Sequence, residues 1–290
     1  WLVPKVEILN IPKTVKLIDA YEGGSLNEGY CKGMQSFLMH LKKFNVASGN
    51  RWYRSYKGIL YTKNGKKLIT VPRKYTAKTV KVKKGTTKIA DSAFSFCTNI
   101  KKVILPDTVK VIEQNAFVCC SLNYIRMPRK LKELGGSAFQ ESALKKITIY
   151  GKVELDETFK YCKKLKTVKL GSNVKSIGKN AFYGCKKLTG VTLNAKLTTI
   201  GNGAFTKCIA LKKITIPAKV TKIGSKAFYG DSKLKTITIK SSKIKSKKIG
   251  KSAFAKINKK ATIRVPKKKL SAYKKIIRSA GAAKSVKIKK

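Results

Sequence analysis

The chain of 290 residues is short of acidic residues, histidine and long apolar runs, and each shortage removes a class of function. His40 is its only histidine, and no Cys-x-x-Cys, G-x-S-x-G or H-E-x-x-H pattern occurs, which argues against zinc sites, serine hydrolases and zinc proteases. A transmembrane helix needs about 18 consecutive apolar residues, and no such run exists. We therefore predict a protein that is not an enzyme, uses no metal or cofactor and has no transmembrane segment.

Arginine is scarce as well, although the chain is strongly basic. Lys and Arg together number 67 against 13 Asp and Glu, for a formal charge of +54, yet only seven of the 67 are Arg. Arg is the usual choice for bidentate recognition of phosphates and bases, whereas Lys is a strongly hydrated point charge. The composition thus favours loose attraction to polyanions over specific nucleic-acid recognition. Because lysines within a Debye length of about 8 Å repel one another, we predict that added salt raises the melting temperature.

The chain is built from a repeat. The segment 165–185, LKTVKLGSNVKSIGKNAFYGC, returns with substitutions at 188–208 and 211–231, so the period is 23 residues. Such a unit cannot bury its apolar face alone, and stacking of units is the usual solution. The sequence therefore predicts an α/β solenoid, with a parallel β-sheet on one face and short helical turns on the other.

Three columns of residues define each predicted rung. The strands carry paired apolar residues two apart, such as Val168 and Leu170, that point into the core. One phenylalanine arrives per rung and predicts a buried spine; these are Phe94, Phe117, Phe139, Phe159, Phe182, Phe205, Phe228 and Phe254. Gly178, Gly201, Gly224 and Gly250 precede this segment and are expected to permit a turn conformation that side chains hinder.

Five of the seven cysteines occupy one repeat position, namely Cys97, Cys120, Cys162, Cys185 and Cys208, with Ser142, Asp231 and Ile257 at the same place in other rungs. The simplest interpretation is a column of small buried side chains with free thiols. One or two disulfides between rungs are the alternative.

We expect a single domain over 1–290 with four parts. Residues 1–51 form a degenerate, enlarged repeat with an irregular loop over 19–37. In 52–75, Asn-Gly between strand-like runs predicts a projecting β-hairpin. Regular repeats fill 76–266, and 267–290 form a C-terminal cap in which Leu270, Tyr273, Ile276 and Ile277 have helical spacing before Gly281.

The repeat resembles a known family. Leu-x-x-Ile-x-Ile-Pro followed by Val-x-x-Ile-Gly-x-x-Ala-Phe-x-x-Cys is similar to the BspA-type leucine-rich repeat of bacterial surface proteins, most clearly over 79–254. The segments 58–69 and 261–273 resemble the family's hairpin-like insertion and terminal segment. The resemblance implies a right-handed leucine-rich-repeat superhelix, secreted or attached to the cell wall, with a role in adhesion. It supplies no catalytic residues.

The outward strand positions give the candidate site. Seven residues are predicted to form a polyanion-binding groove with rings among cations: Lys102, Tyr124, Arg126, Lys146, Tyr150, Lys169 and Lys213. A solvated sheet face is the alternative, since threonine in the same columns is favoured on strands for its shape alone.

Other clusters give weaker hypotheses. Glu154, Asp156 and Glu157 either hold a cation or offset nearby lysines. Gly250-Lys251-Ser252 imitates the end of a phosphate-binding loop but lacks its first glycine and belongs to the repeat turn. The lysine runs at 240–251 and 267–269 are no denser than the rest of the chain.

From these observations we expect a monomeric, extracellular or cell-surface binding module that mediates adhesion through its strand-lined face to a protein or an anionic polysaccharide. An electrostatic anchor to an anionic polymer such as teichoic acid, a glycosaminoglycan or a mucin glycan is the alternative, and non-specific nucleic-acid binding is a third. Because the chain starts at Trp1 without a signal-like segment, we expect any secretion signal or wall anchor to lie outside it.

Overall fold

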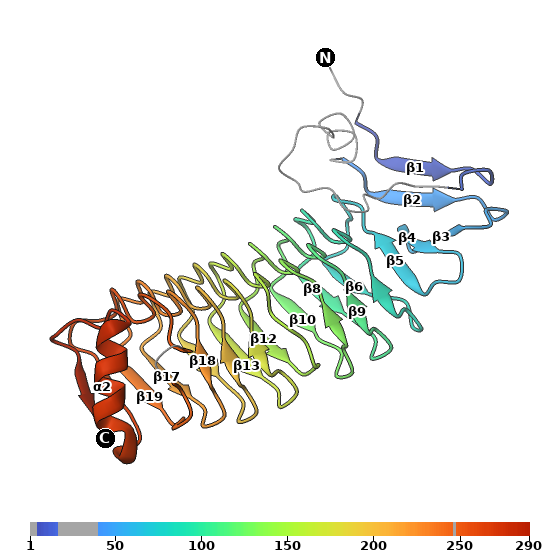
Figure 1. The fold of residues 1–290 in the computed structure, drawn as a ribbon. Coiled ribbons are helices and arrows are strands. Elements are labelled where there is room, and N and C mark those ends of the chain that lie inside the picture. Colours follow the sequence, from blue (N-terminus) through green and yellow to red (C-terminus); the bar gives the residue numbers. More distant parts are fainter. Residues whose placement is uncertain (1–4, 17–39, 246–247) are drawn as a thin grey trace.

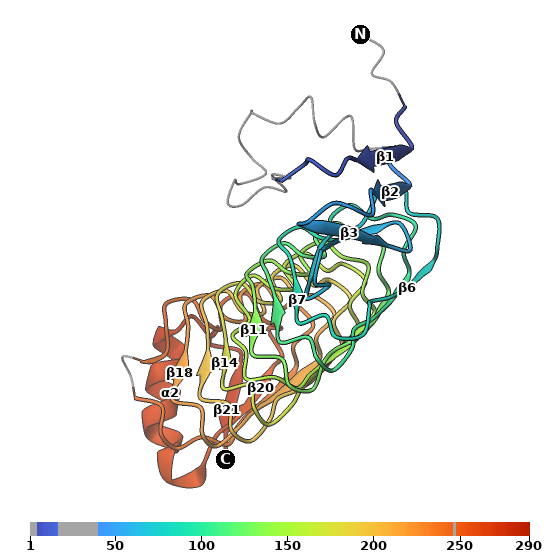
Figure 2. The same ribbon diagram turned by 90° about the vertical axis from the view of Figure 1, so that its right-hand side faces the viewer.

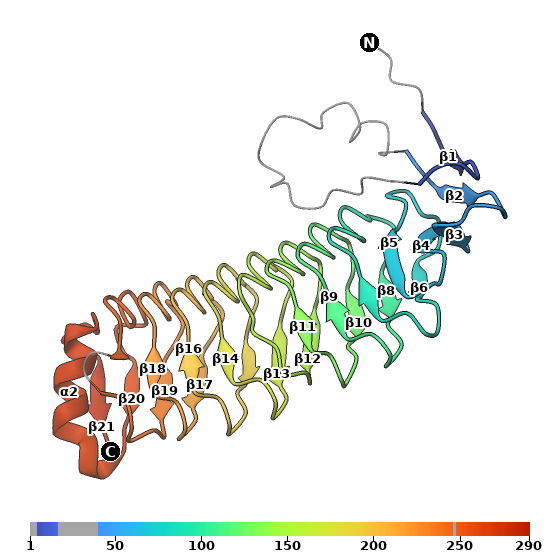
Figure 3. The same cartoon turned by 45° about the vertical axis from the view of Figure 1, so that its right-hand side comes forward.

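The computed structural model describes residues 5–16, 40–245 and 248–290, so the irregular loop expected over 19–37 lies outside the described residues. The chain winds into a long coil with the N-terminal strands at one end and the helix α2 at the other (Figure 1). Views turned by 90° and 45° show strands following two sides of this coil (Figures 2 and 3). The architecture is a β-solenoid of about ten turns rather than an α/β fold.

The first strand face carries one strand per turn. Its members are β6 (Thr79–Lys81), β8 (Lys102–Ile104), β10 (Tyr124–Arg126), β12 (Lys146–Ile149), β13 (Thr167–Leu170), β15 (Gly190–Thr192), β17 (Lys213–Ile216), β19 (Thr236–Ile239), β20 (Thr262–Arg264) and β21 (Lys287–Lys289). Neighbours that pair do so in parallel, for example β12 with β13 and β13 with β15. The predicted alternation holds, since Val168 and Leu170 are buried while Thr167 and Lys169 are exposed.

The second strand face consists of two-residue strands. These are β7 (Lys88–Ile89), β9 (Val111–Ile112), β11 (Glu133–Leu134), β14 (Ser176–Ile177), β16 (Thr199–Ile200) and β18 (Lys222–Ile223). They also pair in parallel, and the isoleucines Ile177, Ile200 and Ile223, each followed by glycine, are fully buried. The two faces thus enclose one continuous apolar core.

The phenylalanine spine is confirmed. All eight rings are buried, and successive centroids lie 4.7 to 5.8 Å apart at interplanar angles of 2° to 19°. Offset stacking of this kind adds to the gain from burying each ring. Every ring inside the spine therefore contacts one ring above and one below.

The short helical turns expected around the spine are wrong. None of the eight phenylalanine segments is helical, and in each the residue two places before and the residue two places after the phenylalanine have positive φ, as at Asn180 (50°) and Gly184 (70°). Alternate N–H groups then point along the coil: those of Asn180, Phe182 and Gly184 donate to Asn202, Ala204 and Thr206 carbonyls at 2.8 Å. A helical turn of this length is marginal in water, whereas this conformation adds a third ladder between rungs.

The role expected of the Ile-Gly glycines is also wrong. Gly178, Gly201, Gly224 and Gly250 are not among the residues with positive φ. Instead, a Cβ at Gly178 would lie 2.7 Å from the carbonyl oxygen of Leu155, and one at Gly201 would lie 2.6 Å from the backbone of Gly178. These glycines allow the rungs to approach closely.

The segment 52–75 contains the predicted hairpin, because antiparallel strands flank Asn64-Gly65, but the hairpin packs into the end of the coil and does not project. Strands β3 (Tyr53–Tyr56), β4 (Ile59–Thr62) and β5 (Lys67–Thr70) pair antiparallel, and β5 then pairs in parallel with β7. Both faces of β4 and β5 are apolar. Tyr61 and Leu68 join the main core, while Leu60 and Ile69 join a second cluster with Phe44 of β2 (Lys43–Val46), which pairs with β1 (Ile8–Ile11). A projecting hairpin would expose both faces to water, so this sheet closes one end of the core instead.

The opposite end has the expected cap. The 3₁₀ turn η2 (Lys267–Lys269) leads into α2 (Leu270–Ser279), which buries Tyr273 and Ile277, and Gly281 follows with φ of 92°. The Tyr273 hydroxyl donates to the Ser241 carbonyl at 2.8 Å, and β21 pairs with β20. The carbonyl of Ala280 accepts the last spine hydrogen bond, from the Phe254 N–H.

Candidate functional site: a groove on the first strand face

Register alone places the candidate side chains next to one another. Lys146 of β12 lies opposite Thr167 of β13, which lies opposite Gly190 of β15. A second row on the same face joins Thr148, Lys169 and Thr192. Because paired parallel strands lie about 4.8 Å apart, a ligand crossing these rows meets a new side chain at each rung.

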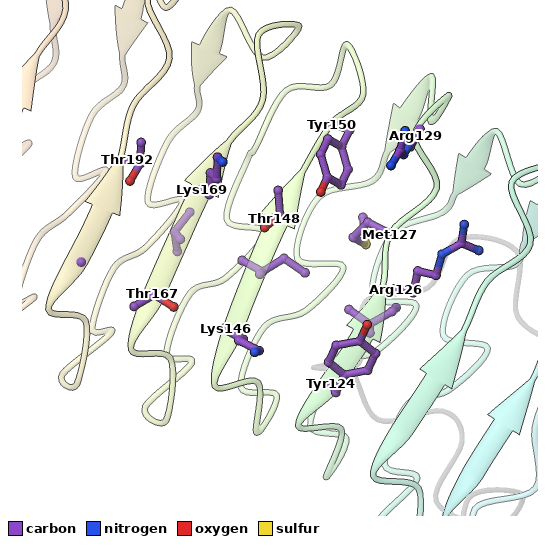
Figure 4. A pocket seen from close by; sticks show the side chains of 14 residues that line it. Tyr124, Arg126, Met127, Arg129, Lys146, Thr148, Tyr150, Thr167, Lys169 and Thr192 are labelled. Atoms are coloured by element: carbon purple, nitrogen blue, oxygen red, sulfur yellow. The ribbon is translucent and has the colours of Figure 1, made fainter.

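These strands, together with β10, line a groove of about 430 Å³ (Figure 4). Buried aliphatic side chains line its inner part, including Met127 and Ile147, which are only 5% and 4% exposed. The rings of Tyr124 and Tyr150 stand at the β10–β12 end and are 38% and 41% exposed. Large exposed rings over a partly apolar groove are typical of a binding surface.

Small residues open the other end of the groove. Thr167, Gly190 and Thr192 occupy outward positions that hold lysine or tyrosine on other strands. Gly190 has no side chain to fill the space, and the nearest atom to a Cβ built there is a methyl carbon of Thr167 at 3.3 Å. The absence of bulk on β13 and β15 therefore makes the hollow.

The charges of the groove are all positive. Its lining includes Arg126, Arg129, Lys146 and Lys169 and no acidic residue. The guanidinium of Arg129 lies over the Tyr150 ring at 6.0 Å from its centroid, a cation–π arrangement. Arg126 is partly neutralised, because its Nη2 binds Oδ2 of Asp107 at 2.9 Å.

The structure brings five of the seven predicted site residues into this groove: Tyr124, Arg126, Lys146, Tyr150 and Lys169. Lys102 of β8 lies beside it, with Nζ 5.4 Å from the centroid of the Tyr124 ring. Lys213 of β17 does not line it.

Arg129 lines the groove but was not among the predicted residues. It follows a strand exit instead of occupying an outward strand position, so the strand columns do not include it. A sequence signal did exist: Tyr150 stands where other rungs have a proline after the strand, at Pro106, Pro128, Pro217 and Pro266. A large ring at that place can contact the neighbouring rung, and Arg129 of that rung lies over it.

The other clusters are explained by local structure. The Glu157 carboxylate binds Nζ of Lys160 at 2.8 Å and Nδ2 of Asn180 at 3.0 Å, so it offsets nearby lysines. Burial raises its pKa, but these hydrogen bonds outweigh burial and hold the pKa below its ordinary value. In the part of the chain that the structure describes, no group of three His, Cys, Asp or Glu is arranged to hold a metal.

The cysteine column consists of free thiols. The six described cysteines are unpaired, and the Cys185 and Cys208 thiols donate to the carbonyls of Phe159 and Phe182, both at 3.1 Å. Burial raises the pKa of the Cys162 thiol to about 12, so it is not a nucleophile at neutral pH. These side chains fill the core.

The comparisons with known proteins agree with this architecture. A family model described as "BspA type Leucine rich repeat region", in six copies, matches residues 73–157 and 155–280. The chain therefore belongs to the BspA-type leucine-rich-repeat family. A search of curated proteins finds no match.

Two solved structures illustrate the likeness. A leucine-rich repeat protein from Eubacterium ventriosum is 28% identical with a TM-score of 0.70, and the alignment covers 78% of this chain. It covers only 59% of the Eubacterium protein, so this chain spans less than two thirds of that length. A leucine-rich repeat protein from Bacteroides ovatus is 22% identical with a TM-score of 0.52, over 98% of this chain and 92% of the other.

The family and the fold are those of repeat scaffolds. Within the described residues we also find no helix with the length and apolar character that crossing a bilayer requires.

Proposed function

We propose that this protein is a non-enzymatic binding module of a bacterial cell surface and that it mediates adhesion through the groove on the first strand face. One observation carries the proposal: two exposed tyrosine rings and several cations converge on a single hollow that has no acidic lining. Membership of the BspA-type family supports a surface location, because the resemblance to this repeat implies a secreted or wall-attached protein. We propose that the module acts as a monomer, since one copy supplies every residue of the groove.

The ligand that fits the groove best is an acidic partner with an apolar surface, which describes an extracellular protein better than a bare polyanion. Arg126 is already tied to Asp107, so the net attraction rests on Lys146, Lys169 and Arg129. The rings and the buried aliphatic lining supply contact area that does not depend on charge.

An electrostatic anchor is the second candidate, supported by a formal charge of +54 spread over the whole chain. The two candidates differ in their response to salt. Binding that releases counterions from a polyanion weakens steeply as salt rises, whereas binding through shape and apolar contact persists. Non-specific nucleic-acid binding, the third candidate, would weaken with salt in the same way as the anchor.

The decisive experiment compares two double variants of equal net charge. One carries Lys146→Glu and Lys169→Glu in the groove; the control carries Lys175→Glu and Lys222→Glu, which lie outside the groove. Binding to immobilised extracellular-matrix proteins, teichoic acid and heparin would be measured at low and high salt.

Loss of matrix-protein binding in the groove variant alone, at both salt concentrations, is the expected result. Equal losses in the two variants, confined to low salt, would replace adhesion through the groove with general electrostatic anchoring. If the protein binds duplex DNA and heparin equally at matched salt, its attraction to polyanions does not distinguish between the two.

A further inference from the structure

The C-terminal part of the coil presents no acidic side chain to solvent. Residues 158–290 contain 38 Lys and Arg but one acidic residue, Asp231. Asp231 is fully buried, and desolvation raises the pKa of its carboxyl well above its ordinary value. No carboxylate therefore competes with an anionic ligand on this part of the surface.

Tyrosines and lysines alternate along one edge of these rungs, directly after the spine phenylalanines. Nζ of Lys207 lies 5.9 Å from the centroid of the Tyr183 ring, and Nζ of Lys256 lies 5.2 Å from that of Tyr229. The Tyr161 ring meets Tyr183 edge to face at 5.2 Å. We call Tyr183, Lys207, Tyr229 and Lys256 the C-terminal ladder.

Glycine sets the spacing of the ladder. Gly184 and Gly230 have φ of 70° and 76° and occupy, in alternate rungs, the position that Lys207 and Lys256 hold in theirs. A Cβ at Gly184 would lie 2.6 Å from a ring carbon of Tyr161, so that ring covers bare backbone. Lysines consequently come at every second rung, roughly 10 Å apart for a rung spacing of about 4.8 Å.

The ladder ends in a second hollow. Lys256 lines a pocket of about 670 Å³ together with Lys259, Lys260 and Asn258. The buried Phe254 and Ile257 also contribute to it, and none of its lining residues is acidic. Three lysines thus line a partly apolar hollow where the regular rungs stop.

We propose that the C-terminal ladder and this pocket form a second binding site, separate from the groove, for a linear acidic polysaccharide. Lys207 and Lys256, about two rungs apart, would meet separate anionic groups of such a polymer, and Lys259 and Lys260 supply further cations at the pocket. The half-buried tyrosine rings, with the Tyr229 hydroxyl hydrogen-bonded to Lys256, offer the mixed apolar and polar contacts that a sugar ring makes.

The same geometry disfavours nucleic acid. Duplex DNA carries one charge per about 1.7 Å, far denser than the ladder. Single strands are held by bases stacked on open aromatic faces, but lysine ammonium groups lie over the faces of Tyr183 and Tyr229. The cations of the ladder are also lysines, not the arginines that recognise phosphate by two hydrogen bonds.

The charge contribution is tested with two variants of equal net charge. One carries K207Q, K256Q, K259Q and K260Q; the control carries K175Q, K196Q, K219Q and K222Q, four exposed lysines outside the ladder in the rungs of Phe182, Phe205 and Phe228. The dissociation constant for a hyaluronan oligosaccharide is measured by calorimetry at fixed salt. We expect the ladder variant to bind at least about tenfold more weakly, and the control to change less than about threefold. Equal losses would overturn the site, as would no binding of hyaluronan by the unmutated protein.

The rings are tested without any change of charge. In Y183T with Y229T, we expect hyaluronan binding to fall several-fold while binding of a single-stranded oligodeoxynucleotide stays unchanged. A fall in DNA binding with unchanged hyaluronan binding would reassign the site to nucleic acid. The groove variants Lys146→Glu and Lys169→Glu, run in the same assay, separate the two surfaces: failure of matrix-protein binding in the groove leaves this site standing, and the reverse also holds.

Discussion

The two parts of the coil, before and after residue 158, use charge in different ways. Residues 1–157 contain 12 of the 13 acidic residues. Among the described residues, every ion pair takes its carboxylate from this part, from Glu7, Asp107, Glu113 or Glu157. The later rungs have no exposed acidic side chain, yet their spine rings stack as closely to parallel as the earlier ones.

The difference shows that the stacking of rungs, and not ion pairing between them, holds the coil together. The charged side chains belong to its surface. If ion pairs were needed to hold the rungs, the later part, which has no exposed acidic side chain, would be less regular. Instead its strands, spine and turn ladder follow the same pattern as the rest. Lysines on this part are consequently free to serve binding, at the cost of mutual repulsion.

The largest expected effect is the loss of stability when the phenylalanine spine, which the two parts share, is interrupted. Phe182→Ala in the later part and Phe117→Ala in the earlier part should each lower the free energy of unfolding by about 3 to 5 kcal/mol, because each removes a ring stacked on both sides. Phe96→Ala, at an exposed position, is the control and should cost far less. Urea unfolding at fixed salt measures all three; equal losses at Phe96 and Phe182 would contradict the role of the spine.

An intermediate effect concerns Asp231, the single acid of the later part. Its Oδ1 accepts the Cys208 N–H at 2.8 Å, while its buried Oδ2 has no hydrogen-bond partner among the described residues. Asp231→Cys places at position 231 the cysteine that most rungs have at this point of the repeat. It should stabilise the fold by about 1 to 3 kcal/mol at pH 7, the usual cost of an unsatisfied buried group.

The pH dependence of that gain has a definite sign. Because desolvation raises the pKa of Asp231 in the folded state, the folded protein binds its proton more tightly than the unfolded chain does. Stability is therefore greatest below the unfolded-state pKa and falls as pH rises toward the folded-state pKa. Urea midpoints measured from acid to neutral pH should show this fall in the unmutated protein and a smaller one in Asp231→Cys; parallel curves would contradict it.

The smallest effect is expected from substituting single lysines, one from each part. Lys88 contacts Glu113, whereas Lys219 is an exposed turn residue of the later part. We expect Lys88→Gln to lower and Lys219→Gln to raise the free energy of unfolding at low salt, each by about 0.2 to 1 kcal/mol. Thermal melting at low and high salt tests this: the two shifts should shrink as salt screens the charges, and the melting temperature of the unmutated protein should rise.

Much of the candidate groove could be predicted from strand periodicity, because outward residues of paired parallel strands must share a face. That reasoning found Tyr124, Arg126, Lys146 and Lys169. It missed Arg129, which lies beyond the end of its strand, and it included Lys213, which the hollow does not reach. The hollow depends on missing bulk at Gly190 and Thr167, and a search for charged or aromatic residues gives small residues no weight.

The sequence by itself determined the solenoid and the phenylalanine spine, because units of fixed period can bury their repeated apolar face by stacking. It also determined the cap, because Leu270, Tyr273 and Ile277 have helical spacing. Tertiary structure alone decided the conformation of the spine turns, the use of the Ile-Gly glycines and the place of β3 to β5. In each of these cases the deciding contact lies in a neighbouring rung some 23 residues away. Local sequence cannot show whether a backbone N–H will bond within its own turn or to the next one, since both satisfy it equally well.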